Sequence, residues 1–197
     1  LDKDGKFLAL RVTGYGNVGA YLGTVAPMPP TMNAVKNTPG VYRTPLLEVS
    51  SKVVFTNTPP VGPYRGAGRP EGNYYMERLV DAAAAGMGIA RLELRRRNHI
   101  APAQMPYKAA SDMVYDSGEF RTVFDKALDF ADVRNFKSRE EKSKQCGKLR
   151  GLGIGSYLEV TAPPSKEMGG IRFEKSGEVT LVTGTLDYGQ GHATTFA

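Results

Sequence analysis

Two short stretches of the sequence carry residue types that suit a bound anion. YRGAGRPEG (Tyr64–Gly72) and YGQGHATTF (Tyr188–Phe196) each place glycines directly before a predicted helix. The first N–H groups of a helix lack intrahelical acceptors, and the positive end of the helix dipole adds to their attraction for an anion. Glycine lets a ligand lie against the backbone because no Cβ stands in the way. The pattern therefore favours a site for a phosphate or another oxygen-rich ligand.

Polar side chains in the two loops could complete such a site. In the first loop, Arg65 and Arg69 could donate charge-assisted hydrogen bonds, and Arg65 could bind a phosphate or oxo group in bidentate fashion. In the second, Gln190 stands between Gly189 and Gly191 and supplies an amide donor and an acceptor. The alternative is that both stretches are ordinary glycine-rich turns with surface arginines. Neither is a P-loop, because no Gly-Lys-Ser/Thr follows.

The other residues that could do chemistry give weaker signals. His192 lies inside the second glycine loop and is a candidate ligand contact. His99 ends a predicted helix, where a cation would complement the dipole, so a structural role is favoured. Cys146 falls in a charged stretch and is expected to be an inert or adventitiously reactive thiol. Glu159 and Asp187 lie near the glycine-rich segments, and no spacing pairs them as an acid and a base.

A third glycine-rich stretch, GLGIGS at 151–156, resembles a dinucleotide-binding fingerprint only superficially. The third glycine of that pattern is replaced by Ser156, and the YLEV that follows continues as a strand where a helix should open. These glycines are better explained by close strand packing or a bulge.

Composition limits the class of protein. The 197 residues are 41% hydrophobic, enough for one domain or two small ones. One cysteine excludes an internal disulfide framework and fits a reducing compartment, so a cytoplasmic location is expected; with only two histidines, no metal site is predicted from this chain alone. No apolar run could span a membrane, and the first residues lack the features of a signal peptide. The net charge of +6 comes from scattered cations, which argues against nucleic acid and suits an anionic cofactor or a partner subunit.

In the first part of the chain, strands precede helices. Residues 7–12 read as the second strand of a hairpin, residues 26–40 as an irregular proline-rich connection, and residues 46–57 as a strand. Apolar spacings of three and four predict helices from Pro70 to about Gly88, at 90–98, and at 117–131 with Ser117 as its N-cap.

The second part of the chain returns to strands after a polar linker at 135–150. Strands are predicted at 151–160, 171–175 and 178–184, the last two joined by a tight turn, and a new helix follows the second glycine loop. The fold class is therefore α+β with mixed α/β character, divided into residues 1–146 and 147–197. Both ends fall within apparent structural units, so the chain is interpreted as a fragment.

Four stretches then resemble, in order, the large molybdenum-binding subunit of the xanthine dehydrogenase/aldehyde oxidase family. They are FTNTPPVGPYRGAGRPEGNYYMERLVDAAAAGMG, ELRRRNHI, GLGIGSYLEVT and TGTLDYGQGHATTFA. The resemblance runs through essentially the whole chain and covers a middle portion of such a subunit. On this basis residues 1–146 belong to a first molybdopterin-binding domain and residues 147–197 to the start of a second.

The resemblance implies a cofactor and a reaction. The cofactor is molybdopterin, in the cytosine dinucleotide form usual in bacterial members, and the reaction is hydroxylation of an aldehyde or N-heterocycle with oxygen from water. Electrons pass to 2Fe-2S clusters and FAD on other subunits or domains. An iron–sulfur subunit and an FAD subunit are therefore the implied partners, in an oligomer that binds a small-molecule substrate.

Family roles for the first loop and the substrate pocket carry over by position. Arg65 in YRGAG corresponds to the family arginine whose loop lies against the molybdenum centre, and Gly66 and Ala67 belong to that loop. Tyr157 and Leu158 fall near the segment that lines the substrate pocket.

The second loop also has family counterparts. Gly189, Gln190 and Gly191 correspond to the loop that contacts the pterin or the molybdenum ligands, with Gln190 as its main polar contact. His192, the next residue, is assigned to the same cofactor-binding loop.

Two positions narrow the subgroup. Carbon monoxide dehydrogenases carry a cysteine after the Tyr-Arg pair to hold copper, whereas this chain has Gly66 and so resembles the form II, carbon monoxide dehydrogenase-like large subunits. Purine-oxidising members have a phenylalanine where Ala67 stands, which argues against a xanthine-like substrate.

The family's catalytic base is a glutamate near the far C-terminus of the subunit, so no catalytic residue is assigned within this chain. Two alternatives stay open at this point. One is a non-catalytic phosphate- or nucleotide-binding module, and the other is an interaction module that keeps the fold without the metal.

Overall fold

The structure is a computed structural model that describes residues 1–160 and 166–196. The chain forms two compact units, Leu1–Glu159 and Val160–Ala197. Helices alternate with three two-stranded sheets, which confirms the α+β class. The division at 146/147 between two cofactor-binding domains stays a prediction.

The elements of the first unit are, in chain order, β1 (Ala9–Asn17), η1 (Pro29–Asn33), α1 (Ala34–Asn37), β2 (Leu46–Val54), α2 (Arg69–Met87), α3 (Arg91–Asn98), η2 (Pro102–Gln104), β3 (Tyr107–Lys108), β4 (Val114–Tyr115), α4 (Phe120–Phe130), η3 (Val133–Asn135) and α5 (Phe136–Gln145). The second unit contains β5 (Gly169–Phe173), β6 (Val179–Thr183) and α6 (His192–Thr195).

The strand predicted at 7–12 is confirmed as β1, which pairs in parallel with β2. The hairpin predicted with a preceding strand stays a prediction. The pairing runs without a bulge from Ala9 opposite Leu46 to Asn17 opposite Val54. The turn that suggested a hairpin exists, but the Asp2 carboxylate closes it by accepting the N–H groups of Asp4 and Lys6. Parallel strands need a long connection, and 28 residues, 18–45, separate the end of β1 from the start of β2.

The connection between β1 and β2 is partly helical, whereas the sequence predicted an irregular segment. The π-helical turn η1 begins at Pro29 and leads directly into α1. Proline is tolerated there because the first N–H groups of a helix have no intrahelical acceptor. The prolines at 27–30 therefore mark the start of a helix.

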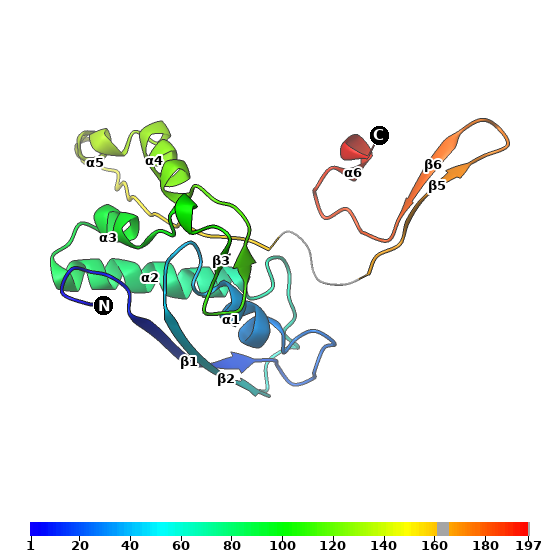
Figure 1. Ribbon diagram of the computed structural model, residues 1–197, viewed down its shortest axis with the longest axis horizontal. Helices are drawn as coiled ribbons and strands as arrows, with labels where there is room; N and C mark the ends of the chain where they lie inside the picture. The colour runs from blue at the N-terminus through cyan, green and yellow to red at the C-terminus, as the bar shows by residue number, and fades with distance from the viewer. Residues whose placement is uncertain (161–165, 197) are drawn as a thin grey trace. The chain divides into compact units, whose positions relative to one another are not determined.

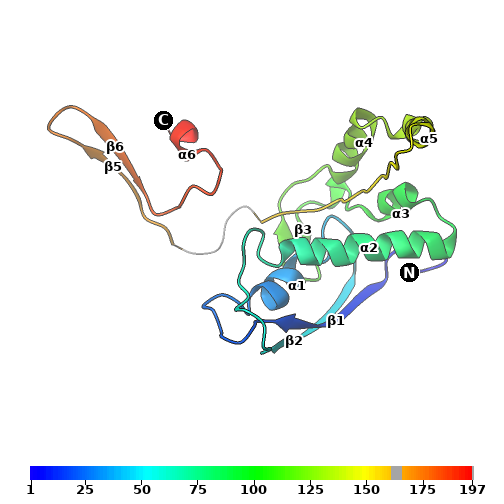
Figure 2. The same ribbon diagram turned by 180° about the vertical axis from the view of Figure 1, so that it is seen from behind.

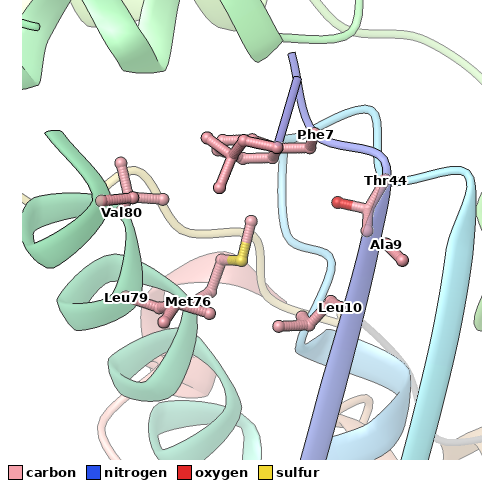
Figure 3. Close-up of a pocket in the computed structure, with 9 residues that line it drawn as sticks. Phe7, Ala9, Leu10, Thr44, Met76, Leu79 and Val80 are labelled. Atoms are coloured by element: carbon pink, nitrogen blue, oxygen red, sulfur yellow. The ribbon is translucent and has the colours of Figure 1, made fainter. Parts of the chain in front are cut away.

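Helix α2 lies at the centre of the first unit. Figure 1 shows it between the β1–β2 pair on one side and α3 with α4 on the other, and Figure 2 shows the same order from behind. The packing is apolar, and its buried residues are Phe7, Leu10, Val41, Tyr42, Met76, Val80, Ala84 and Leu94. In Figure 3, Met76 and Val80 of α2 point toward Phe7 and Leu10. The cavity between them is apolar and holds about 30 Å³, too small for an organic ligand.

The predicted helices are confirmed as α2, α3 and α4, with one wrong cap. Glu119 occupies the N-cap position of α4 without a side-chain bond, and Ser117 Oγ instead donates to Asp116 Oδ1 at 3.1 Å. The apolar stripe of α4 is only partly buried: Phe124 is covered, whereas Phe130 is exposed.

The polar stretch at 135–150 is also not a plain linker, because it forms α5. Glu, Lys, Arg and Gln are good helix formers, and Glu140 pairs with Lys144 one turn later. Cys146 follows the helix and is exposed.

The second unit is built on a hairpin, as predicted. Strands β5 and β6 pair antiparallel from Gly169 opposite Thr183 to Phe173 opposite Val179. The turn places Gly177 at φ 89°, and its N–H donates to the Glu174 carbonyl. The short helix α6 follows the second glycine loop, also as predicted.

A buried cation ties α2 to α3. Arg95 is fully buried; its guanidinium donates to Glu77 Oε2 at 2.8 Å and to Asp81 Oδ1 at 2.8 Å. Tyr42 Oη donates to the other oxygen of Glu77 at 2.6 Å. Burial and the Glu77 charge raise the pKa of Tyr42 far above its ordinary value, so the phenol stays protonated and remains a donor.

Replacing Arg95 should be far more costly than replacing a surface arginine. Arg95→Ala leaves Glu77 buried without its cation, and we expect a loss of about 3–5 kcal/mol in the free energy of unfolding. Arg134→Ala, which removes an exposed pair with Asp129, should cost no more than about 1 kcal/mol. Urea unfolding measures both; similar losses would contradict the role given to Arg95.

Candidate functional site

The first glycine loop has an unusual backbone. Gly66, Ala67 and Gly68 have φ angles of 78°, 50° and 96°, so three successive residues lie in the left-handed region. Glycine adopts this region freely, whereas a residue with a Cβ does so at a cost. The loop ends where α2 begins, and Tyr64 and Arg65 are exposed at its start.

The loop rests on η1. A Cβ on Gly68 would collide with the backbone carbonyl of Pro29, so only glycine fits there. Asn33, the last residue of η1, donates from Nδ2 to the Ala67 carbonyl at 2.8 Å. Asn33 is not predictable from the sequence, because nothing in its local pattern points to a partner 34 residues away.

Arg69 also holds the loop. Its backbone N–H donates to the Gly66 carbonyl at 3.1 Å, and its Nη1 lies 3.4 Å from the same oxygen. Its Nε forms an ion pair with Glu159 at 3.1 Å. The structure therefore uses Arg69 within the protein, in place of the ligand donor suggested by the sequence.

An open groove of about 470 Å³ runs along α2 from the end of this loop. Its lining residues are Pro70, Asn73, Tyr74, Glu77, Arg78 and Asp81 of α2 and Ile154, Gly155, Tyr157 and Glu159 of the facing segment. Tyr157, predicted near the substrate, lines the groove with an exposed ring. Leu158, predicted with it, packs against the core, and its carbonyl accepts from Asn37 Nδ2 at 2.5 Å.

The wall formed by residues 151–159 is held by side chains, so the strand predicted there was wrong. Burial alternates residue by residue, as in a strand, yet within the described chain no strand pairs with the segment. Its carbonyls accept instead from α3: Arg91 Nη2 lies 3.0 Å from Leu152 O, and Arg95 Nη2 lies 3.5 Å from Ile154 O. The buried ion network thus also positions the groove wall.

The second glycine loop, in the second unit, satisfies its own N–H groups. Asp187 accepts from the N–H groups of Gly189 at 2.7 Å and Gly191 at 3.3 Å through Oδ1, and from that of His192 at 2.9 Å through Oδ2. These hydrogen bonds lower the pKa of the Asp187 carboxyl. The expectation of uncommitted donors in this loop was therefore wrong. Asp187 could have been found by its position before a helix, where carboxylates cap N–H groups.

The side chains of the second loop fold back on the same segment. Gln190 Oε1 accepts from the Tyr188 N–H at 2.5 Å, and Nε2 lies 3.5 Å from the Leu186 carbonyl. The His192 ring stacks on Phe196 with centroids 4.6 Å apart. The Arg65 loop belongs to the first unit and the Gln190 loop to the second.

His99 is a core residue and not a cation at a helix end. Its ring stacks on Tyr42 at 5.4 Å and meets Phe124 edge-on at 5.2 Å. Within the described residues neither ring nitrogen has a hydrogen-bond partner. Burial lowers the pKa of His99 to about 4, so the ring is neutral at pH 7.

Comparison with known proteins identifies the family. Residues 1–99 and 124–197 match two models, each described as a molybdopterin cofactor-binding domain. The chain belongs to the molybdopterin cofactor-binding domains. The family is that of oxidoreductases of the xanthine dehydrogenase and carbon monoxide dehydrogenase type, which confirms the predicted resemblance.

Named relatives agree with this assignment. The chain is 32% identical, over its full length, to 25% of the 6-hydroxypseudooxynicotine dehydrogenase complex subunit gamma of Paenarthrobacter nicotinovorans. It is 32% identical over 98% of its length to the carbon monoxide dehydrogenase large chain of Hydrogenophaga pseudoflava, of which it covers 26%. The chain therefore spans about a quarter of the length of these relatives.

A solved structure shares the fold. The crystal structure of quinoline 2-oxidoreductase from Pseudomonas putida 86 matches 98% of this chain and 26% of its own, with a TM-score of 0.82 and 30% identity. Across residues 1–160 and 166–196, none of the helices is both long enough and apolar enough to cross a membrane.

The residues of the first loop fit a molybdopterin. An exposed arginine beside a glycine backbone suits an anionic, oxygen-rich ligand, and the carbonyls of Gly66 and Ala67 are already occupied by donors within the protein. The conformation of the loop is therefore fixed in part by hydrogen bonds within the protein.

Substitution of Gly68 tests how closely the loop packs against the Pro29 backbone. Gly68→Ala combines a φ of 96° with a collision at Pro29, so we expect a loss of at least about 3 kcal/mol in the free energy of unfolding. Gly86→Ala, in open space on α2, should stabilise by about 1 kcal/mol. Equal urea midpoints for the two variants would contradict the close packing of Gly68 against Pro29.

The buried histidine predicts a pH dependence of stability. Its folded pKa of about 4 lies below the ordinary 6.5, so its contribution is fully present above pH 6.5 and is lost as pH falls through 4. The loss should reach about 3 kcal/mol. His99→Phe keeps the ring contacts and removes the titration, so the variant should lose less stability than the parent between pH 6.5 and 4. His192→Phe serves as the control, and its stability should fall with pH as that of the parent does. An equal loss of stability in the parent and both variants would contradict the role given to His99.

Proposed function

We propose that this chain is the cofactor-binding segment of a molybdenum hydroxylase. The observation that carries the proposal is the Arg65 loop: an exposed arginine on a backbone of three left-handed residues, at the start of a 19-residue helix. In this role Arg65 offsets the negative charge of the cofactor, and the Gly66 and Ala67 backbone approaches it closely. The cytosine dinucleotide form of molybdopterin is proposed on the family resemblance.

The second loop is proposed to hold another part of the same cofactor. Gln190 is its main polar contact, flanked by Gly189 and Gly191, with His192 beside it. Because the Gln190 amide bonds only within its own segment in the described residues, its donor and acceptor would be exchanged for cofactor atoms on binding. Exchange of hydrogen bonds costs little net free energy when each bond is replaced.

The substrate class is proposed to be an N-heterocycle or an aldehyde. One relative is named for quinoline, an N-heterocycle, and Ala67 leaves space where a larger residue would stand. Tyr157 lines the groove beside α2 and supplies an aromatic face for a planar ring. Leu158, the next residue, packs against the core.

The protein's own contribution to the reaction is binding and orientation. When bound, the molybdenum cofactor supplies the oxygen and electron transfer that hydroxylates an electron-poor carbon. The Arg65 loop fixes the orientation of the cofactor, and the groove residues exclude water from one face of the substrate. An iron–sulfur subunit and an FAD subunit are proposed as electron-transfer partners, since one relative is named as a subunit of a complex.

The test uses the full-length protein with its partner subunits. We expect molybdenum and a cytosine-containing pterin in the purified complex, and hydroxylation of members of a panel of azaheterocycles and aldehydes. Arg65→Ala should lower the cofactor content about tenfold or more, because a charge-assisted bidentate contact is lost. Arg65→Lys should fall between, since an ammonium cannot bind in bidentate fashion.

The controls separate the possible failures. Arg121→Ala, another exposed arginine of the first unit, should keep full cofactor content. A parent complex without molybdenum would favour the alternative of a non-catalytic phosphate-binding or interaction module. Full content and activity in Arg65→Ala would remove the loop from the cofactor site while leaving the family intact.

A further inference from the structure

Ala67 adopts a backbone conformation that its own side chain does not explain. Among the described residues, the non-glycine positions with positive φ are Ala67, Asp112 and Asp132. Aspartate tolerates this region because its carboxylate can hydrogen-bond locally, whereas alanine has no such group. The cost for alanine is about 1–2 kcal/mol, so contacts from elsewhere must hold Ala67.

The contact that holds it comes from η1. Asn33 Nδ2 donates to the Ala67 carbonyl at 2.8 Å, in a part-buried position. The preceding carbonyl, that of Gly66, accepts from Arg69. Two successive peptide groups of the loop are thus each fixed by a separate donor.

The consequence concerns the presentation of the loop. Because both carbonyls point toward donors of the protein, the direction of the N–H on the opposite side of each peptide group is fixed before a ligand binds. A loop ordered in advance loses less conformational entropy on binding, which raises the affinity for its ligand. Loss of Asn33 would remove the side-chain donor on the Ala67 carbonyl and so weaken the restraint on the left-handed conformation of Ala67.

We propose that Asn33 is a positioning residue for the cofactor loop, keeping Gly66–Gly68 in the left-handed conformation that receives the cofactor. The inference rests on the proposed function of the loop. It assigns no contact between Asn33 and the cofactor, because the amide acts through Ala67. It also assigns a role to the π-helical turn, which brings the amide to the loop at the residue where the turn ends.

The experiment compares variants of the full-length protein in complex with its partner subunits. Asn33→Ala removes the donor, and Asn33→Asp keeps the shape but places an acceptor against the Ala67 carbonyl. Both should lower the retained molybdenum and pterin after prolonged dialysis by about five- to tenfold, since one partly buried hydrogen bond is lost. If Asn33 only fills space, Asn33→Asp will behave like the parent and the proposal is overturned.

A second variant tests the conformational explanation. Ala67→Gly makes the left-handed region accessible at no steric cost, so it should recover a substantial part of the cofactor lost by Asn33→Ala when the two are combined. The melting temperature of the cofactor-free protein should change little in any of these variants. No recovery in the double variant would refute the claim that Asn33 works against the preference of Ala67.

A matched control lies in the same turn. Thr31→Val removes one side-chain hydrogen bond of η1, from Thr31 Oγ1 to the Pro27 carbonyl, without touching the loop. It should retain the cofactor as the parent does; losses equal to those of Asn33→Ala would show a general effect on the turn and overturn the proposal. If the parent complex itself contains no molybdenum, the proposed function fails. If the parent is loaded and the Asn33 variants are loaded equally, only the positioning role fails.

Discussion

The first unit depends on one fully buried guanidinium. Arg95 reaches from α3 to two carboxylates of α2, and a carbonyl of the 151–159 segment lies 3.5 Å from it. A buried cation is tolerated only when its donors are satisfied, so these three parts of the chain must meet in one arrangement. The same requirement sets the distance between α2 and the wall of the groove. Stability and the shape of the candidate site therefore have a common origin.

Helix α2 joins the features that matter for binding. Its first turn ends the Arg65 loop, its exposed side lines the groove, and its buried side packs on β1. Because a helix is stiff, a displacement at its buried side would move the loop and the groove together. Residues far from the loop, such as Phe7, therefore pack against the same helix that carries the loop and the groove.

The sequence predicted the elements whose signals are local. Periodic apolar residues identified α2, α3 and α4, and the turn at Gly177 identified the β5–β6 hairpin. The sequence did not predict contacts between residues far apart in the chain. The parallel pairing of β1 with β2 is one of these, because the connection between the two strands contains no signal for it. Residues 151–160 have the alternation of a strand, but their carbonyls bond to arginine side chains, which no periodicity reveals.

The candidate site shows the same limit in greater detail. Glycines and arginines marked both loops, and family resemblance marked Arg65 and Gln190, but the hydrogen bonds that order the loops were not predictable. In the second loop, the Asp187 carboxylate accepts hydrogen bonds from the N–H groups that were expected to bind a ligand. In the first loop, Asn33 and Arg69 donate hydrogen bonds to the carbonyls. Tertiary packing decides which polar groups become neighbours, and the local sequence around each group does not predict it.

The parallel pair β1–β2 has one more implication, for the tolerance of the chain to changes in length. Nine residues of each strand pair in register, so both ends of the crossover are anchored. The turn η1 lies inside that crossover and must bring its final amide to a carbonyl beyond the second strand. One residue inserted or deleted between the strands could not be absorbed by sliding them, because a shift of register would turn their buried side chains outward. Natural variation in length should therefore be scarce ahead of Asn33 and more frequent at surface connections, such as the turn between β5 and β6.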